Sequence, residues 1–133
     1  MDLSGFVAYD FSQKAPSISI TNNGITFNIG VIRKLQEPGY VSLYINHQTR
    51  EVIIAPSRSI NQSSRKFFNA KSKKAKIVRW NNEALNIELY ELIHPGKKLP
   101  EFYAYRVKGT MVSLDDGRSD GILFDMSQAN EIK

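Results

Sequence analysis

NNGITFNIGVIRKLQEPGYVSLYINHQTREVIIAPS, residues 22–57, is the stretch that decides the fold. It opens on Asn22-Asn23-Gly24, a turn signal because Asn and Gly tolerate a positive φ. Asn28 suits a helix N-cap, and an apolar stripe at helical spacing follows it, before residues that alternate between apolar and polar. The stretch predicts a strand, a short helix and two more strands, at 25–28, 29–35, 40–46 and 51–56. The alternating residues 17–20 add a strand before the turn.

The same order of elements recurs in the second half of the chain. The pattern predicts a strand, a longer helix and two strands at 76–80, 82–93, 102–113 and 121–126. A β-α-β-β unit of this size cannot bury its apolar face alone, whereas two units in one chain can close one core. We therefore expect a mostly β, α+β protein, a small β-barrel built from two β-α-β-β copies. It would be a single domain, 1–133, with copies at about 17–56 and 76–126 joined by a basic connector at 57–75.

The composition limits the classes of protein to which this chain can belong. The chain has 133 residues, 41% of them hydrophobic and 23% charged, as is normal for a soluble globular domain. It has no Cys, which excludes disulfides, thiolate metal sites and Cys nucleophiles. The N-terminus has no signal-peptide pattern, and no apolar run approaches the roughly 20 residues that span a bilayer. We expect a cytoplasmic protein without a membrane partner, and its net charge of +5 favours anionic partners.

The strongest chemical feature is a run of cations without carboxylates between Glu51 and Glu83. Phosphate backbones are bound by such clusters, because binding releases condensed counterions. Phe67, Phe68 and Trp80 lie among the cations, an arrangement that suits stacking on unpaired bases. The alternative is a solvated linker whose aromatic side chains dock on the core, and contact with a protein or membrane surface is a further alternative. The eight cations are Arg58, Arg65, Lys66, Lys71, Lys73, Lys74, Lys76 and Arg79.

A family resemblance rests on the first half. Gly24 lies at the turn, the basic pair Arg33-Lys34 precedes Leu35 in the helix, and a two-strand hairpin with apolar alternation closes the unit. In this order the stretch resembles the AbrB/SpoVT swapped-hairpin family, whose members usually form dimers that share one barrel. The resemblance implies that two copies in one chain make the whole barrel, as a pseudodimer. It also implies that Arg33 and Lys34 contact DNA, for which a solvated helix face is the alternative.

No pattern in the sequence points to catalysis. His47 and His94 fall in predicted turns without a second ligand at metal spacing, so we expect surface residues. The polar loop 115–121 fails as a calcium loop, because Arg118 occupies a ligand position. Glu88 and Glu91 are expected to be solvated. We therefore expect no enzyme activity, no cofactor and no metal.

These observations predict a non-enzymatic nucleic-acid-binding protein, with DNA favoured over RNA. Its small size and basic connector suggest a transcriptional regulator or an accessory protein of a phage or mobile element. One alternative is a protein–protein interaction module, such as an inhibitor of a host enzyme. Another is a single-stranded DNA-binding protein. The sequence leaves monomer and homodimer both open.

Overall fold

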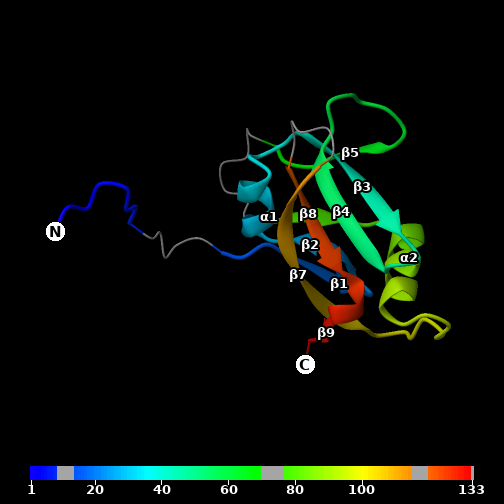
Figure 1. The fold of residues 1–133 in the computed structure, drawn as a ribbon. Coiled ribbons are helices and arrows are strands. Elements are labelled where there is room, and N and C mark those ends of the chain that lie inside the picture. Colours follow the sequence, from blue (N-terminus) through cyan, green and yellow to red (C-terminus); the bar gives the residue numbers. More distant parts are fainter. Residues whose placement is uncertain (9–13, 70–76, 115–119, 133) are drawn as a thin grey trace.

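The structure is a computed structural model that describes residues 1–8, 14–69, 77–114 and 120–132. Strands predominate, with two α-helices and one 3-10 turn among them (Figure 1). In chain order the elements are β1 (Ser17–Thr21), β2 (Gly24–Phe27), α1 (Ile29–Lys34), β3 (Tyr40–Asn46), β4 (Glu51–Pro56), β5 (Ser64–Lys66), β6 (Val78–Trp80), α2 (Glu83–Ile93), β7 (Ala104–Ser113), β8 (Asp120–Asp125), η1 (Met126–Gln128) and β9 (Asn130–Glu131).

The strands form one antiparallel sheet that curls into an open half-barrel. Its order is β5-β3-β4-β8-β7-β1-β2-β6, and β9 pairs with β7 beside this path. The short strands β5 and β6 are therefore the two ends of the sheet. The expected barrel is present as a curled sheet, but its ends do not pair with each other within the part of the chain that the structure describes.

Strand β7 holds the two parts of the sheet together by changing partners along its length. Residues 104–108 pair with β1 and residues 109–113 pair with β8. The change falls at Gly109, where an added Cβ would lie 2.5 Å from the Ile122 side chain and 2.8 Å from the Phe124 ring. Figure 1 shows β7 curving strongly along its length. Close packing explains the bend at Gly109, since only Gly leaves room for these side chains.

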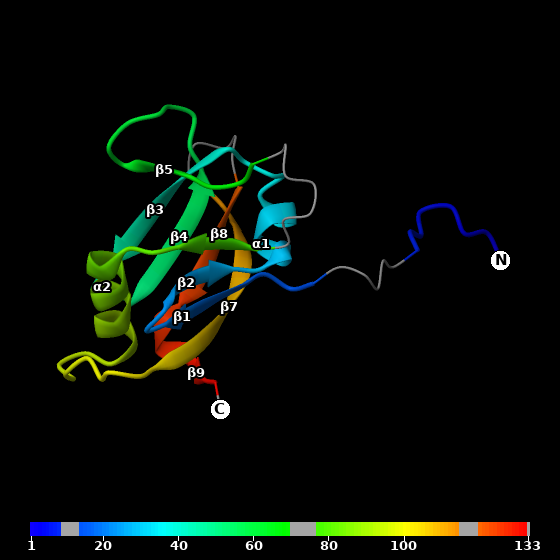
Figure 2. The same cartoon turned by 180° about the vertical axis from the view of Figure 1, so that it is seen from behind.

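The core fills the concave side of the sheet. Alternate residues of the strands point inward, with Ile18 and Ile20 of β1 fully buried. The helices lie at opposite ends of the curled sheet in both views (Figures 1 and 2). Helix α1 buries Val31 and Ile32, and α2 adds Leu89 among other apolar side chains. Each helix therefore closes one end of the core with its apolar stripe.

Local signals of the first half are confirmed. The β1–β2 hairpin turns through Asn22 and Asn23, and Gly24 has a φ of +140°. Asn28 is the N-cap of α1, and its side-chain oxygen accepts a hydrogen bond of 3.1 Å from the Val31 amide. In the second half Asn82 caps α2 in the same way, through the Leu85 amide.

The segment at 57–75, expected as a connector, contains a strand that the sequence did not predict. Residues 64–66 form β5, which pairs with the edge of β3, and Phe67 is buried in the core. Nothing in the Ser-rich sequence alternates in the way that predicts a strand. Strand β5 forms because the edge of β3 offers unpaired backbone groups with which these residues can pair. Residues 70–76 lie outside the described part.

The order of elements in the two halves can now be compared. The order β2-α1-β3-β4 is followed, after β5, by β6-α2-β7-β8. The helices differ in length, with 6 and 11 residues, and β7 has 10 residues where β3 has 7. The origin of this order in a duplication stays a prediction.

Candidate nucleic-acid interface

A groove runs between the segments that hold the two ends of the sheet. It is lined by residues 65–69, which include the end of β5, and by residues 77–80, which include β6, and it encloses about 530 Å³. The two segments are tied together at Trp80, whose indole Nε1 donates a hydrogen bond of 3.2 Å to the Lys66 carbonyl. This bond joins the ends of the open sheet without strand pairing.

Aromatic packing fixes the floor of this groove. The Trp80 ring lies 4.8 Å from the Phe27 ring and 6.2 Å from the Phe67 ring, both edge to face. The amides of Phe67 and Phe68 donate to the Gly39 and Pro38 carbonyls at 2.8 and 3.0 Å. The segment after β5 is therefore bound on one side to the chain that follows α1 and on the other to Trp80.

Three exposed cations stand around this floor. The Arg65 guanidinium lies 5.0 Å from the centre of the Trp80 ring, a cation–π contact, and Lys66 is its neighbour in β5. Arg79 projects from β6 and donates a hydrogen bond of 3.3 Å to the Asn23 carbonyl. Among the described residues that line the groove, none is acidic. The groove is therefore a cationic surface on a rigid aromatic base.

The structure separates the predicted cations into three groups. Arg65, Lys66 and Arg79 meet at the groove. Arg33 and Lys34 are exposed on α1 and do not line it, and Arg58 is exposed after β4. The remaining predicted contacts lie outside the described residues: Lys71, Lys73, Lys74 and Lys76.

The expected stacking of bases on the aromatic side chains is wrong for two of the three. Phe67 is 7% exposed and Trp80 is 4% exposed, and the Arg65 guanidinium lies over the Trp80 ring. These rings dock on the core, which was the alternative interpretation. Phe68 is half-buried and lines the groove. The sequence could not separate the two roles, because core packing and base stacking use the same side chains.

Both histidines have partners that the sequence did not reveal. His47 Nε2 lies 3.0 Å from a carboxylate oxygen of Glu88, which links the β3–β4 turn to α2 across the surface. His94 Nε2 lies 2.8 Å from the Tyr105 hydroxyl, and both rings pack near Tyr90. In the described parts of the chain, no three His, Cys, Asp or Glu side chains gather in a way that could hold a metal ion.

The Tyr105 hydroxyl, the partner of His94, has a shifted pKa. Burial raises the pKa of the Tyr105 hydroxyl, and Tyr90 and then Glu131 raise the pKa further. The neutral phenol is therefore favoured beside His94. This cluster joins α2 to β7, and its bonds explain why the end of the helix is held on the sheet.

Comparisons with family models, with curated proteins and with solved structures found no match to this chain. Within the described residues, neither helix is long and apolar enough to cross a membrane.

Proposed function

We propose that this protein binds nucleic acid without catalysis, through phosphate contacts in the groove around Trp80. One observation carries the proposal: the groove brings together Arg65, Lys66 and Arg79 from opposite ends of the sheet. Among the described residues that line this groove, none is acidic. Cations held this way meet a polyanion without competition from neighbouring carboxylates.

Four further lysines of the basic segment would add to these contacts. Asn69 and Ile77 both line the groove, and Lys71, Lys73, Lys74 and Lys76 lie between them in the sequence, outside the described residues. Three phosphate contacts on duplex DNA would give a slope of log affinity against log salt of about −3, and seven contacts about −6.

Binding of this kind orients the backbone and discriminates little between duplex sequences. Phosphate contacts carry no direct sequence information, which is obtained from base edges. Arg33 and Lys34 would add further contacts from α1, as the swapped-hairpin resemblance implies. That resemblance, the pseudodimer and a regulatory or accessory role on the DNA of a mobile element form the finer part of this proposal.

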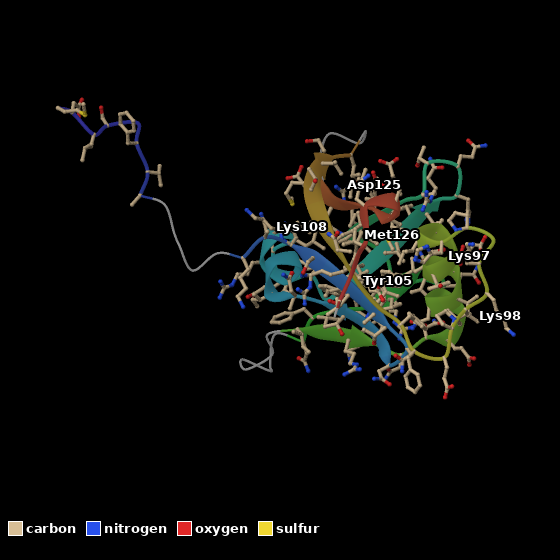
Figure 3. All side chains as sticks on the ribbon, turned by 90° about the horizontal axis from the view of Figure 1, so that it is seen from below. Lys97, Lys98, Tyr105, Lys108, Asp125 and Met126 are labelled. Carbon is tan, nitrogen blue, oxygen red and sulfur yellow. The ribbon has the colours of Figure 1, made fainter. Side chains whose placement is uncertain are left out.

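Fluorescence anisotropy with labelled duplex and single-stranded DNA, at two salt concentrations, tests the proposal. The groove variant is Lys66→Gln with Arg79→Gln, and the matched control is Arg106→Gln with Lys108→Gln, which removes the same charge. Arg106 and Lys108 are exposed on β7, and Figure 3 labels Lys108. In the sheet β1 and β2 lie between β7 and β6, and β8, β4 and β3 lie between β7 and β5, so the control charges stand apart from both walls of the groove.

The groove variant is expected to lose affinity and to reduce the salt slope by about 2, one unit for each phosphate contact. The control is expected to stay close to the parent protein. Equal losses in the two variants would show that net charge alone attracts DNA. Affinity that does not change with salt would contradict the proposal and favour the alternative of a protein-binding module.

A further inference from the structure

A second depression lies beside the groove and has a different chemistry. It encloses about 480 Å³ between the β1–β2 turn, the start of α2 and the segment before β7. Five of the side chains that line it are amides: Asn22, Asn23, Asn81, Asn82 and Asn86. We call it the asparagine pocket.

The asparagine pocket is built by long-range contacts. Gly24 has a φ of +140°, and an added Cβ would lie 2.8 Å from both the Asn81 side-chain oxygen and the Trp80 carbonyl. Asn22 and Tyr103 join the turn to the segment before β7, because the Asn22 amide donates to the Tyr103 carbonyl at 3.2 Å. Glycine at the turn therefore lets three separate segments meet around one space.

One polar atom of the asparagine pocket has no partner among the described residues. Asn86 is 6% exposed, and its Nδ2 donates to the Thr21 carbonyl at 2.7 Å and to the Tyr103 hydroxyl at 3.1 Å. These bonds fix the orientation of the amide, and its Oδ1 is left buried without a donor. Buried acceptors are nearly always satisfied, so Oδ1 lacks an N–H or O–H donor. Less than 1 Å² of this oxygen is exposed, so a donor in the pocket reaches it when the side chains around it move.

The lining selects the class of ligand. Glu83 and Glu101 belong to it, so an anion is disfavoured, whereas Ile87, Leu99 and Pro100 offer apolar contact. A flat, uncharged group with donors and acceptors along its edge fits this combination. Amide side chains recognise nucleobase edges through such paired hydrogen bonds.

The pocket and the groove adjoin each other. Arg79 and Trp80 line the groove, and the next two residues, Asn81 and Asn82, line the pocket. The Arg79 guanidinium itself contacts the Asn23 carbonyl at the edge of the pocket. A strand whose phosphates lie on Arg79 therefore brings a neighbouring base to the asparagine side chains.

We infer that the asparagine pocket binds an unpaired nucleobase that carries an exocyclic amine, with this amine directed to Asn86. The inference rests on the proposed function, because the groove would supply the adjoining backbone contacts. An unpaired base is required, since a base stacked in a duplex cannot enter a pocket, whereas an unpaired base can be splayed out of its strand. The protein would then prefer single strands that contain adenine or cytosine over the same length of thymine.

Free nucleosides test the pocket apart from the groove, since they have no phosphate. The ¹⁵N-labelled full chain is titrated with adenosine, cytidine and thymidine, and with methyl riboside as the sugar control, while side-chain amide signals are recorded by NMR. We expect adenosine and cytidine to shift the amide signals of Asn81 and Asn86. No shift with any nucleoside, or equal shifts with methyl riboside, would overturn the inference.

Asn81→Ala provides the matched variant, because no hydrogen bond of the Asn81 side chain is found in the described structure. It is expected to weaken binding of adenosine and of single-stranded oligo-dA about five- to tenfold, as for the loss of one base-edge contact. The control is Asn130→Ala on β9, an exposed amide outside the pocket. Unchanged binding of adenosine and oligo-dA by Asn81→Ala would count against the pocket.

The two proposals fail separately. Lys66→Gln should weaken DNA binding and leave nucleoside binding intact, because Lys66 lines the groove and not the pocket. DNA binding without any nucleoside binding would remove the pocket and keep the groove. Nucleoside binding without DNA binding would remove the proposed function and limit the pocket to small ligands.

Discussion

The two halves of the chain share an order of elements and differ in what each element does. In the first half α1 is short and β3 pairs with β4 and β5. In the second half α2 is nearly twice as long, and β7 joins both parts of the sheet by pairing with β1 and then with β8. The two halves thus share the order of their elements, while strand β7 of the second half connects the two parts of the sheet. In the described chain the sheet stays open because its end strands β5 and β6 do not pair with each other, and the groove lies at that opening.

The largest expected effect comes from the bend that only the second half contains. Gly109→Ala would place a Cβ against the Ile122 and Phe124 side chains. We expect the free energy of unfolding to fall by about 1–3 kcal/mol, as for an overpacked core. Urea denaturation measures this, with Gly39→Ala as control, because an added Cβ there meets nothing within 4 Å. Equal effects would mean that the sheet adjusts freely at Gly109.

A smaller effect is expected where the first half supports the helix of the second. Arg50, in the β3–β4 turn, donates hydrogen bonds of 2.7 Å to the carbonyls of Leu92 and Ile93 at the end of α2. Arg50→Met would leave these carbonyls unpaired and cost about 2 kcal/mol of the free energy of unfolding. Exposed Arg106→Met is the control for lost charge. A loss no greater than the control's would show that solvent replaces Arg50.

The N-cap residues of α1 and α2 allow a direct comparison of the two halves of the chain. Asn28 accepts from the amides of Val31 and Ser17 and donates to the Ala15 carbonyl, whereas the bond found for the Asn82 side chain is with the Leu85 amide. Asn28→Ala is expected to cost about 1.5 kcal/mol and Asn82→Ala about 1 kcal/mol of the free energy of unfolding. Thermal and urea unfolding of both variants measure the difference. A larger loss for Asn82→Ala would contradict the comparison.

The smallest effect is a pH dependence confined to the second half. The pKa of Tyr105 is raised in the folded protein, chiefly by burial, so folding disfavours the ionised phenol. The stability that the neutral phenol contributes is complete below its unfolded pKa of about 10 and is lost as pH rises through the higher folded value. Urea titrations should therefore give a lower free energy of unfolding at pH 10.5 than at pH 8. This decline should be smaller in Tyr105→Phe. An identical decline in the variant would assign the effect to other groups.

The sequence by itself determined the features that neighbouring residues control. Asn and Gly at the first turn, Asn28 as a cap and the apolar stripe of α2 act within a few residues, so their patterns predicted the elements correctly. The cations of the groove were also named from the sequence, because a run without carboxylates is visible there.

Tertiary structure alone decided which of these residues meet. Strand β5 exists because β3 offers an unpaired edge, and the burial of Phe67 and Trp80 depends on Phe27, about forty to fifty residues away. The five asparagines of the pocket come from two distant segments. Contacts of this kind depend on how the sheet curls, and no local pattern encodes that curvature, because it arises from the packing of side chains from many strands at once.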